Sequence, residues 1–128
     1  MQKYFVSYTQ AVALKKLEFN EKCYGYFTKH EEFFYFDVDD LSSNYTKNMD
    51  NLVVNSIDEL ECTAPLKTQV FEWGRKKGYD TKVQKESEEL YFGFYWNDVA
   101  WIIVGNGSYE EAESACVDKL IELEKNKI

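Results

Sequence analysis

Two aromatic runs constrain this chain more than any other feature of its sequence. They cover residues 33–36 and 91–96, in a chain of 128 residues of which 17% are aromatic. Because alternate residues of a β-strand point to opposite faces of its sheet, each run places rings on both faces. One face can enter a core. The other must be covered by a helix, be covered by a partner or remain exposed, and we favour cover by the chain's own helices.

The amino-terminal third predicts a helix followed by a β-hairpin. Ser7 and Gln10 have the spacing of a capping box, in which each side chain bonds the other residue's backbone amide, and the helix should end near Asn20. Residues 23–29 and 32–38 are rich in aromatic residues, which favours two strands.

The middle of the chain gives weaker local signals. Residues 39–60 mix Asp, Ser and Asn with scattered apolar residues, so we expect a long loop with one short strand at 52–54. Thr63-Ala64-Pro65 predicts the start of a helix, because threonine can cap free amides and proline is tolerated in the first turn. Gly78 is predicted to end this helix in a left-handed conformation.

The carboxy-terminal part predicts an antiparallel meander and a final helix. The three expected strands cover residues 79–85, 90–96 and 99–104, and Asn97-Asp98 suits a two-residue turn between the last two. Gly105-Asn106-Gly107 should break the last strand. Ser108 and Glu111 form a second capping box, and the small residues that follow would let this helix approach a sheet closely.

Together these elements predict the α+β class, with an antiparallel sheet packed by helices. An α-β-β-β-α unit (63–128) should follow a helix, a hairpin and an acidic loop (1–62), within a single domain of residues 1–128. No apolar run reaches the about 20 residues of a membrane span, and the first six residues lack the apolar core of a signal peptide. We therefore expect a cytoplasmic protein that does not contact membranes.

The net charge of −8 is concentrated in one segment. Residues 1–29 carry +3, residues 30–62 carry −8 and residues 63–128 carry −3. A negative field of this kind repels phosphate backbones and can attract a basic protein surface, so we expect no direct binding to nucleic acid.

No residue set predicts catalysis, a metal site or a cofactor. The acidic run at Asp37 lacks the glycine and glutamate that an EF-hand loop requires, and His30, the single histidine, is expected at a surface turn. The cysteines are widely spaced, which favours buried thiols in a reducing compartment: Cys23, Cys62 and Cys116. We therefore expect that the protein is not an enzyme.

The order of elements from Thr63 onward resembles the double-stranded RNA-binding domain. The likeness extends to Gly105-Asn106-Gly107-Ser108 before an alanine-bearing helix. The lysines with which that family contacts RNA are replaced here by Tyr109, Glu110 and Glu113, and carboxylates there would repel phosphate. The resemblance therefore implies the topology without the RNA-binding activity.

A second resemblance covers nearly the whole chain. Five stretches of the sequence carry it: Ser7 to Leu17, Cys23-Tyr24-Gly25-Tyr26, Thr63-Ala64-Pro65, Trp73 and Tyr109-Glu110-Glu111-Ala112. They are similar to a family of short uncharacterised proteins from Bacteroides-type bacteria and their phages. This resemblance implies an origin in a phage or mobile element and no particular activity.

Two functional hypotheses remain open. The first is a non-catalytic protein-binding or self-associating module, for example a homodimer, with Tyr91 and Tyr95 as outward-facing anchors because phenols tolerate water. The second is an acidic mimic of nucleic acid that inhibits a host DNA-binding or defence protein. The acidic residues expected to contact a partner are Glu31, Glu32, Asp37, Asp39 and Asp40.

Overall fold

A computed structural model describes residues 2–36 and 60–127, which form two compact units, Met1–Leu66 (unit 1) and Lys67–Ile128 (unit 2). Each unit combines helices with its own antiparallel sheet, so the predicted α+β class is confirmed. The strand predicted at residues 52–54 lies outside the described residues. None of the helices that the structure describes is long and apolar enough to cross a bilayer.

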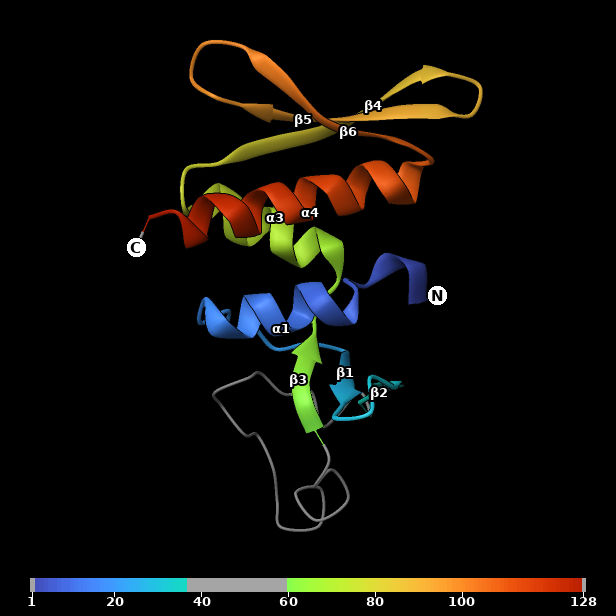
Figure 1. The fold of residues 1–128 in the computed structure, drawn as a ribbon, viewed down its shortest axis with the longest axis vertical. Helices are drawn as coiled ribbons and strands as arrows, with labels where there is room; N and C mark the ends of the chain where they lie inside the picture. The colour runs from blue at the N-terminus through green and yellow to red at the C-terminus, as the bar shows by residue number, and fades with distance from the viewer. Residues whose placement is uncertain (1, 37–59, 128) are drawn as a thin grey trace. The chain divides into compact units, whose positions relative to one another are not determined.

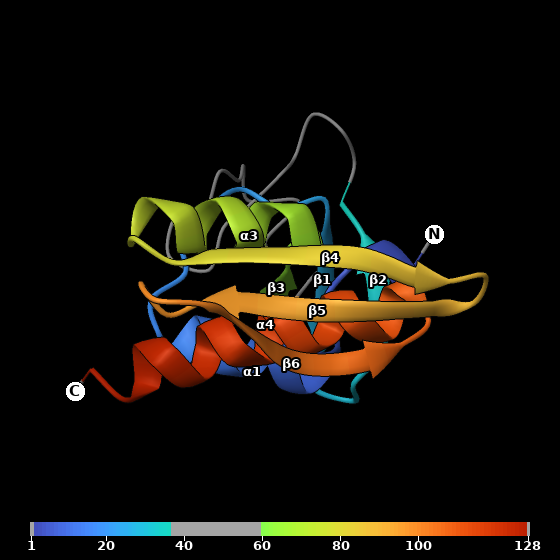
Figure 2. The ribbon, with the colours of Figure 1, turned by 90° about the horizontal axis from the view of Figure 1, so that it is seen from above.

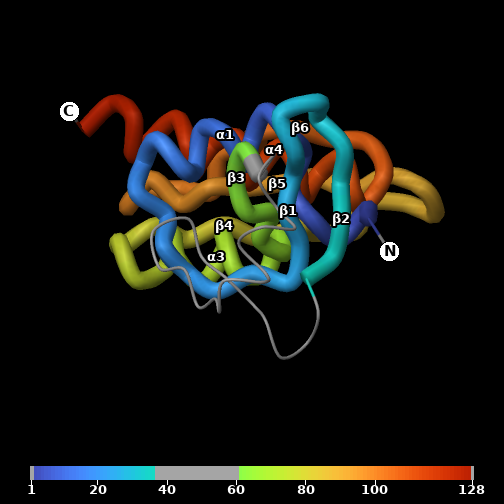
Figure 3. The backbone as a smooth tube through the Cα atoms, turned by 90° about the horizontal axis from the view of Figure 1, so that it is seen from below, coloured from blue at the N-terminus to red at the C-terminus, as the bar shows by residue number. Residues whose placement is uncertain are grey.

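In its described residues, unit 1 contains a 3₁₀ turn, one α-helix and a three-stranded sheet. The elements are η1 (Gln2–Tyr4), α1 (Tyr8–Lys16), β1 (Gly25–Thr28), β2 (Phe33–Tyr35) and β3 (Leu60–Ala64). The sheet order is β2-β1-β3 with antiparallel pairing, and Figure 3 shows β1 between its two neighbours. The predicted hairpin is therefore confirmed, with shorter strands than expected.

Helix α1 begins where its capping box predicts. The Ser7 hydroxyl accepts a bond of 3.2 Å from the Gln10 amide, and the Gln10 side chain accepts one of 2.9 Å from the Ser7 amide. The helix ends at Lys16, earlier than the predicted Asn20, and Glu18 then adopts a left-handed conformation with φ of 66°. The Lys15 ammonium donates to the Glu61 carbonyl of β3 at 2.6 Å, which ties the helix to the sheet.

The predicted helix start at Thr63-Ala64-Pro65 is wrong. Thr63 and Ala64 belong to β3, where they pair with Tyr26 and Gly25 of β1. Pro65 follows the strand, and its carbonyl accepts a bond from the Val6 amide at 3.1 Å. Pairing with a distant strand therefore overrides the local capping signal, and the helix begins only at Lys67.

The first aromatic run places rings on both faces of the unit 1 sheet, as alternation predicts. The Phe33 ring lies 4.9 Å from that of the buried Phe5 and 5.5 Å from that of the buried Phe27. Phe34 points the other way, where it stacks on Tyr26 at 5.7 Å and remains 44% exposed.

Unit 2 has the predicted α-β-β-β-α order. Its elements are α3 (Lys67–Lys76), β4 (Asp80–Ser87), β5 (Leu90–Trp96), β6 (Trp101–Gly107) and α4 (Tyr109–Lys125). The sheet order is β4-β5-β6, and all pairing is antiparallel. Figures 1 and 2 show that α3 and α4 lie side by side on the same face of this sheet.

The ends of both helices in unit 2 follow local signals. Gly78 adopts φ of 92° after α3, and the neighbouring Tyr79 amide bonds back to the Gly74 carbonyl at 2.9 Å, as predicted for a left-handed helix end. At α4 the second capping box is present, with the Ser108 hydroxyl accepting from the Glu111 amide at 3.1 Å.

The boundaries of β6 differ from the prediction of residues 99–104. The turn before it spans four residues because the Asn97 side chain accepts bonds from the amides of Val99 (3.0 Å) and Ala100 (2.8 Å). Asp98 adopts the expected positive φ, 74°. Gly105-Asn106-Gly107 continues the strand and does not break it, since Gly105 and Gly107 pair with Gly93 and Tyr91 of β5.

Candidate functional site

Helix α4 packs directly against the middle of β5 at a glycine. A side chain on Gly93 would place its Cβ 2.7 Å from the Ala112 carbonyl oxygen and 2.9 Å from the Cys116 sulfur. Gly105 of β6 lies in the same way against the Ala115 side chain. The absence of side chains at these two strand positions allows the helix to approach the backbone closely.

The prediction that Tyr91 and Tyr95 face outward is wrong. Alternation places both on the same face as Gly93, which is the helix-covered face. The Tyr91 ring makes an edge contact with Tyr109 of α4 at 5.4 Å. The Lys119 ammonium of α4 lies 5.4 Å from the Tyr95 ring centroid. Both tyrosines are half-buried, so they support the packing of α4 and leave the other face to the remaining aromatic residues.

The opposite face of the unit 2 sheet carries aromatic and aliphatic side chains, and neither α3 nor α4 covers it (Figure 2). We call this surface the open face. The Phe92 and Phe94 rings lie 6.2 Å apart, and the Trp96 and Trp101 rings 5.4 Å apart. The apolar residues of the open face are Phe92, Phe94, Trp96, Trp101 and Ile103, and its polar residues on the paired strands are Asp80, Lys82, Gln84 and Asn106.

Lys82 supplies a positive charge on the open face. It pairs with Phe94 across the strands, so both side chains project on the same side. Its ammonium lies 4.4 Å from the Trp101 ring centroid and 5.3 Å from that of Phe94, which is cation–π geometry. Asp80 shares this face because it pairs with Trp96, so β4 contributes one charge of each sign here.

The apolar side chains of the open face are more exposed on β6, one of the two edge strands, than on the central strand β5. Trp101 is 39% exposed and Ile103 54% exposed, whereas the rings on the central strand β5 are partly covered by their neighbours. Large apolar residues that remain uncovered next to one another mark interaction surfaces more often than isolated ones do. The expectation that the chain's own helices cover both faces of the second aromatic run therefore fails within unit 2.

A cavity of about 170 Å³ lies on the covered side of unit 2, between α3, β4 and α4. Its lining includes Arg75, Val83 and Glu113, and Glu113 is only 6% exposed. Burial raises the pKa of the Glu113 carboxyl, against the opposing effects of Lys67 and of a hydrogen bond to Tyr109. The cavity is smaller than the about 300–1,000 Å³ of typical ligand pockets.

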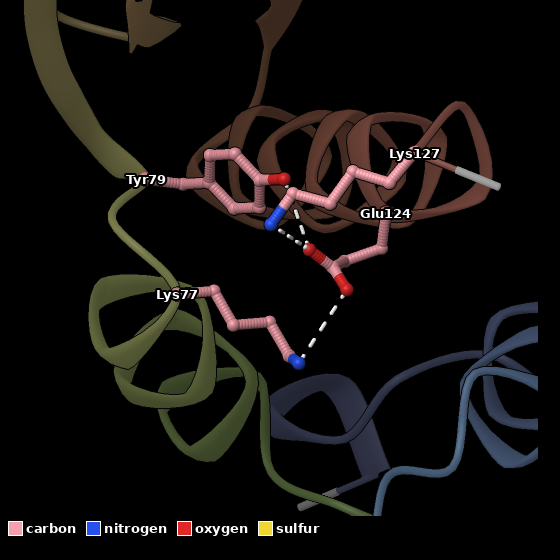
Figure 4. A network of polar contacts seen from close by, with 4 residues as sticks. All are labelled: Lys77, Tyr79, Glu124 and Lys127. Atoms are coloured by element: carbon pink, nitrogen blue, oxygen red, sulfur yellow. Dashed lines mark hydrogen bonds and ion pairs between the residues drawn. The ribbon is translucent and has the colours of Figure 1, made fainter.

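A polar network joins the end of α4 to the segment between α3 and β4, as Figure 4 shows. The Glu124 carboxylate accepts from the Tyr79 hydroxyl at 2.9 Å and lies 3.4 Å from the Lys77 ammonium and 3.1 Å from that of Lys127. Although partial burial alone would raise the pKa of Glu124, these neighbours hold it below its ordinary value. The polar groups of these four side chains interact with one another, so we infer that the network stabilises the fold.

The three cysteines are free and fully buried, as predicted. Burial raises the pKa of Cys23 to about 12 and that of Cys62 and Cys116 to about 11. Such thiols remain protonated at neutral pH and are poor nucleophiles. Among residues 2–36 and 60–127, no group of three or more His, Cys, Asp and Glu side chains could hold a metal ion.

The predicted acidic partner-binding residues are only partly described. Glu31 and Glu32 are exposed at the hairpin turn of unit 1, where Glu31 adopts φ of 65°. Asp37, Asp39 and Asp40 lie outside the described residues. The acidic site therefore stays a prediction.

Comparisons with known proteins found no match among protein-family models, curated proteins or solved structures. The resemblance to proteins of Bacteroides-type bacteria and their phages therefore stays a prediction from the sequence.

Proposed function

We propose that this chain is a small non-catalytic module that binds a protein chain, either another protein or a second copy of itself, through the open face. The proposal is supported above all by the group of rings on β5 and β6, of which Trp101 is exposed and those on β5 are partly exposed, with Lys82 among them. Aromatic residues bury a large area at little entropic cost and dominate the measured energies of protein interfaces. Coding by a phage or mobile element is part of the proposal and rests on the sequence resemblance alone.

The arrangement of charge favours a protein partner over nucleic acid. A surface that binds single strands combines stacking rings with a basic groove along the phosphates. The open face has rings, but among its paired strand residues only Lys82 and Asp80 are charged, one of each sign, and the whole chain carries −8. An apolar protein surface needs no such groove.

The test compares removal of aromatic side chains on and off the open face. The variants Phe94→Ser and Trp101→Ser should each lose a captured protein partner or self-association, measured by affinity capture and by size-exclusion chromatography with light scattering. Tyr24→Ser is the control, because Tyr24 is an exposed aromatic residue (46%) that lies in unit 1, off the open face. Binding that survives both open-face variants would refute the proposal.

Salt separates this proposal from acidic mimicry of nucleic acid, which rests on the −8 of residues 30–62. Mimicry predicts that partner binding collapses between about 50 and 200 mM salt, because charges at the surface are screened. Binding through the open face should change little over the same range.

A further inference from the structure

Three consecutive residues of β6 are apolar and exposed, and this pattern points to contact along the strand edge. Trp101, Ile102 and Ile103 are 39%, 44% and 54% exposed. Trp101 and Ile103 belong to the open face, whereas Ile102 pairs with Tyr95 and so projects toward the helix side. A partner lying flat on the open face would leave Ile102 uncovered. An occupant that covers all three must therefore lie beside β6.

The two edges of the unit 2 sheet differ in their protection against such pairing. The edge strand β4 carries four charged residues: Asp80, Lys82, Lys85 and Glu86. Charges on an edge strand oppose its pairing with another strand. Strand β6, with the sequence WIIVGNG, has no charged residue and no proline. Only its register shift near Gly105 interrupts the edge, beyond the three exposed residues.

We propose that β6 pairs antiparallel with β6 of a second copy of this chain, so that two three-stranded sheets join into one. This proposal keeps one partner that the proposed function allows, a second copy of the chain, and adds a contact at the strand edge beside the open face. A two-fold axis perpendicular to the sheet reverses the strand direction and keeps each face on the same side. The open faces of both copies would therefore be continuous.

The register follows from the hydrogen bonds of the β5–β6 turn. The Asn97 amide donates to the Ala100 carbonyl at 3.2 Å, which makes this a hydrogen-bonded pair. Because bonded and non-bonded pairs alternate, the backbone groups of Trp101 and Ile103 point away from β5 toward the free edge. They can therefore bond to a second strand.

Pairing centred on Ile102 satisfies these groups and covers all the exposed side chains at once. Trp101 of each copy then lies opposite Ile103 of the other on the open face, and the two Ile102 side chains meet on the helix side. Aromatic residues opposite β-branched ones are favourable cross-strand pairs. The exposed segment is thus complementary to itself, which favours a second copy over an unrelated strand.

Size and charge predict a weak dimer that strengthens with salt. A short edge contact buries less than the about 800 Å² per partner of a standard interface, so we expect a dissociation constant of about 1–100 µM. Each copy carries −8 in total and no charge on β6, so added salt should screen repulsion without breaking attractive pairs.

Cysteine cross-linking tests the register. Directly opposed residues of a non-hydrogen-bonded pair have Cα atoms about 4.5 Å apart, which a disulfide can bridge. Ile102→Cys should therefore form a covalent dimer under mild oxidation, and the three native thiols are buried and add no background. Gln84→Cys, an exposed position on β4, is the matched control and should stay monomeric.

A charge substitution tests the edge in solution. Sedimentation of the wild-type chain from about 5 to 300 µM should show a rising dimer fraction, and Ile102→Lys should weaken it at least tenfold while its circular dichroism stays native. Gln84→Lys makes the same charge change on β4, the other edge of the sheet, and should leave the dimer intact. A wild-type chain that stays monomeric, or a dimer indifferent to Ile102→Lys, would overturn the inference.

These outcomes separate the inference from the proposed function. Because Ile102 is not part of the open face, Ile102→Lys should leave capture of a different protein unchanged. A monomer that still loses a partner with Phe94→Ser would retain the proposed function and reject pairing at β6. A dimer that depends on Ile102 and is insensitive to Phe94→Ser would instead retain pairing at β6 and reject self-association through the open face.

Discussion

Substitution of Gly93 by alanine should destabilise the protein, because α4 occupies the space that the new methyl group needs. The added Cβ would lie 2.7 Å from the Ala112 carbonyl oxygen, closer than the 3.0 Å below which real Cβ contacts are essentially never found. The obstacle is helix backbone, which cannot change rotamer. Either α4 or β5 must therefore move, or both must strain.

Two opposing effects set the change that Gly93→Ala makes in the free energy of unfolding. Adding a methyl group to a packed site costs about 1–3 kcal/mol. Replacing glycine within a strand restores about 0.5–1 kcal/mol of conformational entropy. Because the clash is with helix backbone, the upper part of the first range applies, about 2–3 kcal/mol. We therefore expect a net loss of about 1–2.5 kcal/mol in the free energy of unfolding, or roughly 3–10 °C in Tm for a chain of this length. Urea and thermal unfolding followed by circular dichroism measure both.

Gly105 provides the matched control, because its obstacle is a side chain. Gly105→Ala would bring its Cβ against that of Ala115, and Ala115→Gly removes the obstacle. The double variant should recover the loss from the clash, less about 1 kcal/mol for glycine inside a helix.

The result that would refute this reasoning is a Gly93→Ala variant as stable as the wild type or more stable. In that case α4 does not contact β5 at this point. The assignment of Tyr91 and Tyr95 to the covered face, and of Phe92 and Phe94 to the open face, would then fail with it.

Three further predictions concern the covered side of unit 2. Tyr91→Ala with Tyr95→Ala should lower the free energy of unfolding by about 1–3 kcal/mol in urea, and weaker association at unchanged stability would contradict the helix-facing placement. Glu124→Gln should cost about 1 kcal/mol at pH 7. The folded pKa of Glu124 lies below its ordinary 4.5, so this stabilisation is present above that pH and is lost in acid. The free energies of unfolding of the variant and the wild type should therefore converge as the pH falls. A difference that stays constant with pH would show that ionised Glu124 does not stabilise the fold. Cys116 should resist thiol reagents until urea unfolds the chain, since burial raises its pKa to about 11. Rapid modification of Cys116 in the folded state, located by mass spectrometry, would show that this side of α4 is not packed against β5.

Short-range signals in the sequence predicted the starts of α1 and α4 and the end of α3. In a capping box both partners lie three residues apart, so the bond forms wherever the chain enters a helix. Gly78 accepts the positive φ of a helix end without the steric cost of a side chain. The bounds of β5, Leu90–Trp96, were also predicted, because a continuous aromatic run strongly favours extended backbone.

Local signals failed where a distant segment competed with them. Thr63 and Pro65 suit a helix start, but β1 offers strand partners to four of residues 60–64, Thr63 included. That partner lies more than thirty residues earlier in the chain, outside any local pattern. The short strand also ends at the proline, which cannot donate a backbone hydrogen bond.

The sequence by itself determined which aromatic side chains share a face of β5, since the period of a strand is two: Tyr91 with Tyr95, and Phe92 with Phe94 and Trp96. Only the tertiary structure decided which face is open. The preference of phenols for water suggested that the tyrosines face outward, but α4 docks where Gly93 and Gly105 leave room for its small residues. Shape complementarity between helix and sheet outweighed the small difference in polarity between tyrosine and phenylalanine. It left Phe94, Trp101 and Ile103 uncovered by the helices of unit 2.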